Sequence, residues 1–462
     1  MRQSTTRGSA LRIVLPMALV WLVCLAIAPV ALSGPLRNIV DPDATPSFTI
    51  TSNGYGVSRD AAFGVAVRGG AAYVAGVAGN AAGNSDATLA KIANGAQSWR
   101  KSYDGPAHKY DLALDLAIGP GGVVYTAGGS QNAIDKEDFL VVKWSPSGKV
   151  LWARRYDGPL HGDDRAYDLG VDKYGNVTVA GVSQGTGDKD WAVVSWSSSG
   201  VKRWVWRYDG SAHAGDYPAD VIVTPSGDVY VTGGVVVSGP KDAALTVRFS
   251  RTGKKLWSRL YLGISSLGAG TGGMTPRPGG GVITCGYTEA VLTAGDGLVM
   301  SYTPAGKRLA FVPDAGVNGQ YFSDVAVASN GTIVAVGRDL SAGTRARVRL
   351  YRKDGSPLGA GTSGGGAWGA TFAAVATDRF GGYYPVGYYK SSDTESQLWT
   401  WRLPVVAGGG TWASLWGPAD LHSVGERNEA HAIAVSGTTV YVVGDYYTVA
   451  EGWNQVVLVY IY

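Results

Sequence analysis

Cysteine and charged residues are scarce in this sequence. Only 2 of its 462 residues are cysteine, and charged residues make up 16% of the chain. Cys24 lies in a hydrophobic N-terminal stretch, so a chain that loses this stretch keeps Cys285 alone and cannot form an intrachain disulfide. Cys285 falls in an apolar run, and we predict a buried strand thiol without a nucleophilic role.

Strong basic character is also missing. The formal net charge is +4, and Arg2, Arg7 and Arg12 lie in the first 33 residues, which contain no acid. Removing these three arginines leaves +1, and no dense run of Lys or Arg follows, so we expect no nucleic-acid partner. The sequence also lacks the His-Glu-x-x-His and phosphate-loop motifs.

The N-terminus has the pattern of an export signal. The three arginines precede an almost unbroken apolar stretch at residues 13–32, and Ala31 and Ser33 supply small residues at a cleavage site. We therefore predict a cleaved signal peptide over 1–33, a linker over 34–46 and one domain over 47–462. The protein is then secreted or exposed on the cell surface, with no membrane contact beyond the signal. An uncleaved anchor is the alternative, because the stretch approaches spanning length.

Glycine is abundant, and part of it is periodic. The sequence holds 68 glycines, and one glycine ends each Tyr-Val-Ala-Gly-like stretch at intervals of 50 to 57 residues. These anchor glycines are Gly76, Gly128, Gly181, Gly233, Gly286, Gly337, Gly387 and Gly444. A regular repeat of this length along the whole chain indicates a closed or stacked array of similar units.

Each unit has the pattern of four short strands. In the unit around Gly181, strands are predicted at residues 166–172, 177–182, 190–197 and 202–208, separated by turns rich in Gly, Ser and Asn. No helical segment lies between them. The fold class predicted is all-β, a single β-propeller of eight four-stranded blades whose last blade is closed by the N-terminal strand.

The fourth strand carries a Trp-x-x-x-Tyr marker. Its two aromatic residues share one face of a strand, so we expect them to pack between blades, although exposed rings of this kind can also stack on carbohydrate. The pairs are Trp99 and Tyr103, Trp152 and Tyr156, Trp204 and Tyr208, and Trp257 and Tyr261, with Trp412 and Trp416 as a variant.

The two ends of the chain carry matching fragments of a unit. The last unit ends on its third strand at residues 455–462, and the segment 47–55 is an unpaired strand before the first unit. Pairing them completes one blade and removes two open sheet edges.

One family resemblance follows from these motifs. The stretches DFLVVKWSPSG at 138–148 and LWARRY at 151–156, with the pattern from Asp164 to Gly181, resemble the bacterial β-propeller repeat called SBBP. The resemblance covers 60–260 well and 322–337 and 428–462 partly, and it weakens at 268–281 and 360–369. A more distant, fold-level likeness to quinoprotein dehydrogenases transfers no function.

Histidines recur after the fourth strand. They are His108, His161 and His213 at one offset, with His422 one residue later, and acids follow at Asp111, Asp163, Asp164 and Asp216. A propeller places these loops on the same face as the loops between strands two and three. Our ligand-face candidates are His108, Asp111, His161, Asp164, His213 and Asp216. The interpretation we favour is that His and Asp bond the loop backbone and bind no metal.

A second periodic acid begins the third strand. It occurs at Asp86, Asp138, Asp190, Asp242 and Asp296, with Arg345, Glu395 and Asn454 at the remaining positions. An arginine at an equivalent position argues against an essential metal ligand, and we expect these carboxylates to accept hydrogen bonds from loop amides.

These observations favour a scaffold over an enzyme. We expect a monomeric, non-catalytic propeller that needs no cofactor and binds an extracellular protein or glycan through polar loops at 79–85, 130–136 and 183–189. The alternative is an extracytoplasmic hydrolase or lyase, metal-assisted in one version, that uses the Asp and His residues of the same face. A cluster of unlike polar residues in the central channel would favour the enzyme.

Overall fold

The computed structural model describes residues 48–52, 60–239, 241–263, 268–290, 293–313, 319–340, 344–362, 369–390, 396–404, 412–416, 427–448 and 452–461. The predicted signal peptide, the linker and His422 lie outside these residues. Regular structure in the described part consists of 32 strands and one short 3-10 turn, η1 (Pro120–Gly122). No membrane-spanning helix occurs among the residues described.

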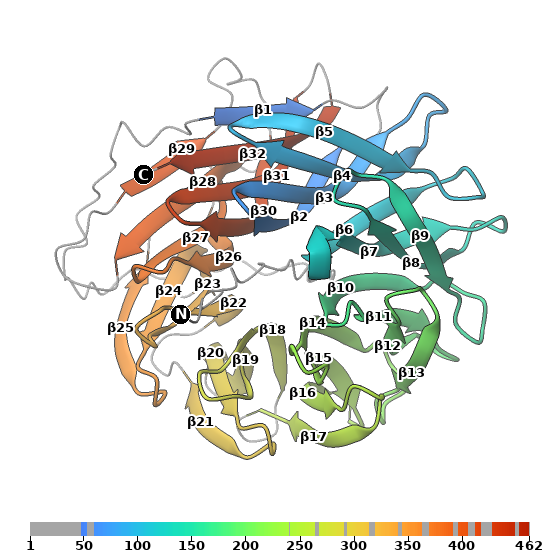
Figure 1. Ribbon diagram of the computed structural model, residues 1–462. Helices are drawn as coiled ribbons and strands as arrows, with labels where there is room; N and C mark the ends of the chain where they lie inside the picture. The colour runs from blue at the N-terminus through green and yellow to red at the C-terminus, as the bar shows by residue number, and fades with distance from the viewer. Residues whose placement is uncertain are drawn as a thin grey trace, which may run out of the picture.

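The strands form four-stranded antiparallel sheets arranged in a ring (Figure 1). Seven blades are each built from four consecutive strands. Blade 1 contains β2 (Ala61–Arg68), β3 (Ala71–Gly79), β4 (Ser85–Ala93) and β5 (Ala96–Tyr103). Blade 2 contains β6 (Asp111–Ile118), β7 (Val124–Gln131), β8 (Glu137–Trp144) and β9 (Val150–Tyr156). Blade 3 contains β10 (Arg165–Val171), β11 (Val177–Gln184), β12 (Lys189–Trp196) and β13 (Lys202–Tyr208).

The remaining contiguous blades follow the same order. Blade 4 contains β14 (Tyr217–Val223), β15 (Val229–Val237), β16 (Lys241–Phe249) and β17 (Lys255–Tyr261). Blade 5 contains β18 (Ala269–Pro276), β19 (Val282–Ala290), β20 (Thr293–Tyr302) and β21 (Arg308–Pro313). Blade 6 contains β22 (Gln320–Val327), β23 (Ile333–Asp339), β24 (Arg345–Tyr351) and β25 (Pro357–Thr362). Blade 7 contains β26 (Ala370–Thr377), β27 (Gly382–Lys390), β28 (Ser396–Pro404) and β29 (Trp412–Trp416).

The eighth sheet is composite and joins the two ends of the chain. Its order is β1 (Phe48–Ser52), β32 (Gly452–Ile461), β31 (Thr439–Thr448) and β30 (Arg427–Ser436). Phe48 lies opposite Val459 and Ser52 opposite Gln455, so the predicted pairing of the terminal segments is confirmed over five residues. The expected number of eight blades is corrected in one respect. Seven blades are contiguous in sequence, and the count reaches eight only when the composite sheet is included, because β30–β32 need β1 to cover their open edge.

The anchor glycines have a steric cause. Each one lies opposite a β-bulge in the first strand of its blade; Gly181, for example, pairs with Ala166 just before a register shift to Asp168. A Cβ at Gly181 would overlap the carbonyl oxygen of Arg165, and all eight anchors meet a carbonyl oxygen in the same way. The period therefore marks a close approach of two backbones, which only glycine permits.

The first strand of blade 3 ends one residue earlier than predicted. Asp172 is buried and lies in the following turn, where its Oδ1 accepts hydrogen bonds from the backbone N–H groups of Tyr174 and Asn176, both at 2.8 Å. A carboxylate that caps a turn in this way leaves the strand ladder.

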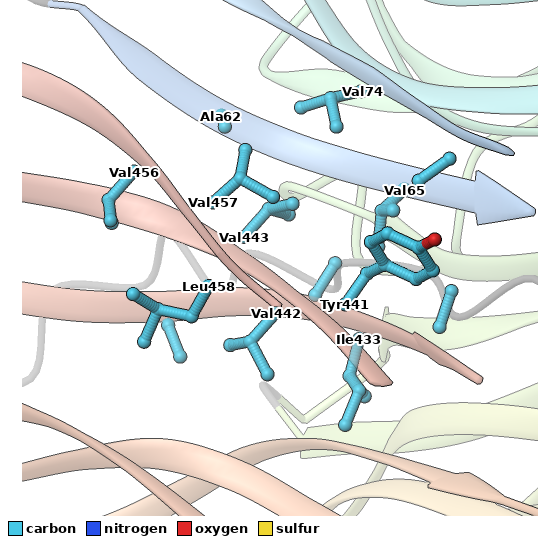
Figure 2. Close-up of a cluster of buried hydrophobic side chains, with 14 of the residues drawn as sticks. Ala62, Val65, Val74, Ile433, Tyr441, Val442, Val443, Val456, Val457 and Leu458 are labelled. Atoms are coloured by element: carbon cyan, nitrogen blue, oxygen red, sulfur yellow. The ribbon is translucent and has the colours of Figure 1, made fainter. Parts of the chain in front are cut away.

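The core consists of apolar side chains packed between neighbouring sheets. Figure 2 shows the cluster where the composite sheet meets blade 1, with Val443 and Val457 on the side of the sheet that faces Ala62. Fully burying one such valine or leucine contributes about 1.5–3 kcal/mol. This cluster ties the last strands of the chain to the first blade.

The Trp-x-x-x-Tyr marker packs between blades, as predicted. Trp152 packs edge-to-face on Tyr125 of its own blade, with ring centroids 5.8 Å apart. Its Nε1 donates a hydrogen bond to the carbonyl of Ser198 in blade 3 at 3.1 Å. Trp257 repeats this link with Pro304 of blade 5 at 2.8 Å. The side chains of Trp412 and Trp416 lie outside the description.

Candidate functional site

Two sets of loops meet on one face of the ring. Asn84, between β3 and β4, donates its side-chain N–H to the carbonyl of His108, between β5 and β6, at 2.7 Å. The predicted placement of the histidine loops beside the loops between strands two and three is therefore confirmed here. We name the surface made by residues 80–84, 104–110, 132–136, 157–163, 185–188 and 209–215 the loop face.

The three histidines occupy one tight turn that recurs at three junctions. His108, His161 and His213 have φ values of 51°, 52° and 50°, in the left-handed region where histidine is several-fold enriched among non-glycine residues. Each backbone N–H bonds the carbonyl of the glycine three residues earlier, as in His108 to Gly105 at 2.9 Å. The recurrence of histidine thus has a backbone cause.

Each imidazole contacts the aspartate four residues earlier. Nδ1 lies 2.7 Å from Asp104 Oδ2 in the first turn and 2.6 Å from the equivalent oxygen in the other two, Asp157 and Asp209. This hydrogen bond, followed by the charge of the same aspartate, raises the pKa of each histidine. The three side chains are 77%, 73% and 71% exposed, so solvent and ligands reach them freely.

The aspartates that follow the histidines are buried and hold the turns. Oδ2 of Asp111 and of Asp164 accepts a hydrogen bond from Gly105 N and Gly158 N, each at 2.6 Å, and Asp216 accepts one from Gly210 N. Burial raises the pKa of Asp111 and Asp216 to about 6 and raises that of Asp164. The predicted bonding of loop backbone applies to these aspartates; the histidine side chains contact carboxylates instead.

The structure joins the two acid series that the sequence analysis treated separately. Three aspartates meet at each connection between blades 1 and 2, 2 and 3, and 3 and 4. One begins the third strand of the first blade, one belongs to the Tyr-Asp-Gly turn, and one is the buried acid near the start of the next blade. Their carboxylate oxygens lie within 4.8 Å of one another. The three clusters are Asp86, Asp104 and Asp111; Asp138, Asp157 and Asp164; and Asp190, Asp209 and Asp216.

Sequence reasoning did not nominate the turn aspartates Asp104, Asp157 and Asp209. Their signal was present, since each directly follows the marker tyrosine of its unit.

The third-strand acids bond side-chain groups. Asn80 Nδ2 donates to Asp86 Oδ1 at 2.6 Å, and Asn132 Nδ2 donates to Asp138 Oδ1 at 3.0 Å. Asp190 instead lies 3.4 Å from the guanidinium of Arg207. In these three clusters the acids thus accept hydrogen bonds from side-chain groups, not from the loop backbone amides that the sequence analysis expected.

Ionic contacts connect neighbouring loops into a belt. Lys109 Nζ lies 2.6 Å from Asp135 Oδ1, and Lys136 Nζ lies 3.7 Å from Asp163 Oδ2. Ile134, at the tip of the β7–β8 loop, is 68% exposed. Leu160 in the next loop is 48% exposed. The loop face over blades 1–4 thus combines carboxylates with isolated apolar side chains.

A different polar cluster lies on β30 and β31 of the composite sheet. Glu429, His431 and Asp445 bring one donor atom each to within 4.8 Å of one another, and His431 Nε2 lies 2.9 Å from Asp445 Oδ1. His431 and Asp445 are buried. Sequence reasoning missed this cluster because its residues belong to no repeat.

The comparisons with known proteins identify the fold. The chain is similar to Sqt1 from Chaetomium thermophilum, with a TM-score of 0.54 and 12% identity over 91% of this chain and 99% of that one. Sqt1 bound to the N-terminus of ribosomal protein L10 matches equally, over 100% of its chain. The propeller domain of the Trilobed protease from Pyrococcus furiosus has a TM-score of 0.42 and 10% identity, over 74% and 94% of the two chains. No family and no curated protein matches the sequence. The chain is thus a β-propeller with structural likeness to Sqt1.

Proposed function

We propose that this protein is an exported propeller scaffold of the SBBP type that binds a partner protein through the loop face. The observation that carries the proposal is the set of ordered loops over blades 1–4. One turn geometry repeats there at three blade connections, and ionic contacts link the loops of blades 1–3. A surface whose backbone is already ordered loses little conformational entropy on binding.

The chemistry of the loop face favours a basic partner segment. The turn aspartate of each cluster is partly exposed on the loop face, whereas most of the other cluster carboxylates are buried. Asp135 and Asp163 add carboxylates, each of which also contacts a lysine. At neutral pH these groups create a negative potential that attracts lysine and arginine side chains. The exposed histidines take up a proton readily, so they reduce this negative potential as the pH falls.

Exposed apolar side chains on the same face supply anchoring contacts. Ile134 and Leu160 occupy consecutive loops of the loop face, and Tyr110, at the end of the 104–110 loop, is 38% exposed. Large apolar and aromatic residues surrounded by polar groups commonly carry most of the binding energy of an interface. A protein partner uses both kinds of contact, whereas a neutral glycan leaves the carboxylates without counter-charges.

Sqt1 supports the scaffold part of this proposal. It has been solved bound to the N-terminus of a ribosomal protein, so a propeller with a related fold holds a peptide segment. We extend to the present chain only the use of the propeller as a binding scaffold.

Site-specific cross-linking tests the proposal. A photoreactive residue replaces Ile134 on the loop face, and a matched variant carries it at Tyr174, which is 53% exposed on a turn at the other end of blade 3. With the extracytoplasmic fraction of the source cells, we expect a saturable protein product from the Ile134 position that weakens with rising salt, and none from Tyr174. Equal products from both positions, or a glycan that binds while no protein does, would refute the proposal.

A further inference from the structure

We propose that Glu429, His431 and Asp445 bind one divalent transition-metal ion on the first two strands of the composite sheet. This site is separate from the loop clusters of blades 1–4 and goes beyond the proposed binding function. Its three side chains come from β30 and β31, the two strands of that sheet farthest from β1.

The strand register brings the three side chains together. Glu429 lies directly opposite Asp445 in the β30–β31 pair, so both carboxylates occupy the same face of adjacent strands. The register shift between Ala430 and Ala432 makes His431 the bulged residue of β30. Its Nε2 lies 2.9 Å from Asp445 Oδ1, and Glu429 completes a set whose donor atoms span at most 4.8 Å.

These dimensions are close to those of a coordinated ion. Ligand atoms at about 2.0–2.2 Å from a tetrahedral zinc ion lie about 3.3–3.6 Å apart, so the widest pair of the set would contract by up to about 1.5 Å on binding. Glu429 is the partly exposed member and has the freedom to make this movement. His431 and Asp445 are 7% and 0% exposed and are already in place.

The donor set selects the class of metal. One imidazole nitrogen with two carboxylates suits zinc, manganese or iron with further positions open to water. Calcium takes 6–8 oxygen ligands and is poorly served by this set. Two carboxylates opposite each other on adjacent strands repel, and a cation between them replaces repulsion with attraction in a partly desolvated place.

The repeat of the fold does not explain this cluster. The bulged residue of the other seven first strands is Phe63, Leu114, Tyr167, Ala219, Gly272, Ser323 or Ala373. The residue after the anchor glycine is an acid only at Asp445; elsewhere it is Val77, Gly129, Val182, Gly234, Tyr287, Arg338 or Tyr388. A residue that merely helps a blade to fold would recur, and these do not.

Neighbouring rings frame the site. The Phe63 ring of blade 1 lies 5.3 Å from the imidazole of His431, tilted by 43°, and restricts its rotation. Tyr388 of blade 7 lies close enough to Glu429 for the negative charge of that carboxylate, together with the larger effect of burial, to raise the tyrosine pKa. The cluster therefore lies where the composite sheet meets blades 1 and 7.

Calorimetric titration of the metal-stripped mature protein with zinc, manganese or calcium chloride tests the proposal. We expect one equivalent of zinc or manganese per chain and a rise in Tm of several degrees. Glu429→Gln is the main variant, because a partly exposed side chain tolerates the change. It should keep the metal-free Tm within about 1 °C and weaken binding at least tenfold, and His431→Asn should do the same if it folds.

The loop clusters provide the control. The double variant His161→Ala, Asp164→Asn removes one carboxylate of the Asp138, Asp157 and Asp164 cluster and the imidazole that contacts Asp157, and it should bind zinc as the unaltered protein does. The proposal is overturned if calcium binds and zinc and manganese do not, if no metal binds stoichiometrically, or if Glu429→Gln binds normally.

Discussion

The carboxylate of Asp168 in blade 3 accepts a hydrogen bond from the backbone N–H of Val221 in blade 4, with 2.5 Å between Oδ2 and the nitrogen. The same bond recurs at three other blade contacts. The backbone N–H donates from Leu169 to Asp115 at 3.3 Å, from Met274 to Asp220 at 2.8 Å and from Val375 to Asp324 at 2.9 Å. Each aspartate follows the bulge of its first strand, so the bulge directs a carboxylate to the next blade. These bonds hold neighbouring blades in fixed relative positions.

Removing one such bond should destabilise the ring. Asp168→Ala removes the carboxylate that accepts the buried N–H of Val221, whereas Leu169 keeps Asp115 as an acceptor. We therefore expect a loss of about 1–3 kcal/mol in the free energy of unfolding, measured by denaturant titration. Asp168→Asn keeps one carbonyl oxygen and should lose less. Asp135→Ala, on the exposed loop, is the control and should change stability by under about 0.5 kcal/mol. Similar losses for Asp168→Ala and Asp135→Ala would contradict a stapling role.

The anchor glycines should not tolerate a methyl group. A Cβ at Gly181 overlaps the carbonyl of Arg165, so Gly181→Ala forces the first two strands of blade 3 apart and should lower stability by about 2 kcal/mol or more, measured as Tm. Gly234→Ala, on β15, has no heavy atom within 4 Å of the added Cβ and should leave Tm within about 2 °C. If the two variants unfold at the same temperature, the steric account of the period fails.

The Asp216 carboxylate should make stability depend on pH. Its folded-state pKa of about 6 lies above the ordinary 3.8, so the folded protein takes up the proton first. The resulting stabilisation is present at low pH and is lost as the pH rises through about 6. The stability of the unaltered protein relative to Asp216→Asn should therefore increase by on the order of 1 kcal/mol between pH 7.5 and pH 5.

Parallel denaturant titrations of both proteins at the two pH values measure this effect. A difference that stays constant or shrinks on acidification would show that the Asp216 pKa is not raised. Asp135→Asn, which alters an exposed carboxylate, serves as the control for general effects of pH.

The strand β1 should be needed to close the ring. Removing residues 34–52 exposes the edge of β32, and we expect a lower Tm and concentration-dependent association in analytical ultracentrifugation. Removing residues 34–46 keeps β1 and is the matched control. Adding a peptide of residues 47–52 should restore part of the lost Tm. Identical behaviour of the two truncated chains would show that β1 contributes nothing to closure.

The thiol of Cys285 should be inert in the folded protein. It is 1% exposed, and burial raises its pKa well above the ordinary value, so the reactive thiolate is not populated at neutral pH. In a chain that begins at residue 34 and so lacks Cys24, a colorimetric thiol reagent should detect no reaction in native buffer over an hour and one equivalent in denaturant. Rapid reaction of the native protein would contradict the buried placement.

Local sequence patterns predicted much of the strand arrangement because the causes of those patterns are local. The anchor glycine at Gly181 reports a backbone contact within one hairpin, and the turn with His161 is set by a few consecutive residues. The pairing of β1 with β32 also followed from the sequence, since two fragments of one unit were left over at the ends.

The boundaries were less predictable. Asp172 lies in an alternating apolar stretch and was assigned to a strand, yet its carboxylate caps the next turn. A strand residue and a turn-capping residue have the same sequence pattern at Asp172. Only the position of the Tyr174 and Asn176 backbone amides shows that Asp172 caps the turn.

The sequence by itself determined the four-stranded unit, its repeat, the closure of the ring and the recurring histidine turns, because hydrophobic alternation, turn residues and steric limits act over short distances. The tertiary structure alone decided which carboxylates meet. Asp138 and Asp164 share a cluster, Asp168 reaches Val221, and Glu429 and His431 join Asp445, because each group depends on how strands pair and how blades pack against one another. That geometry has no signature in the local pattern of residues.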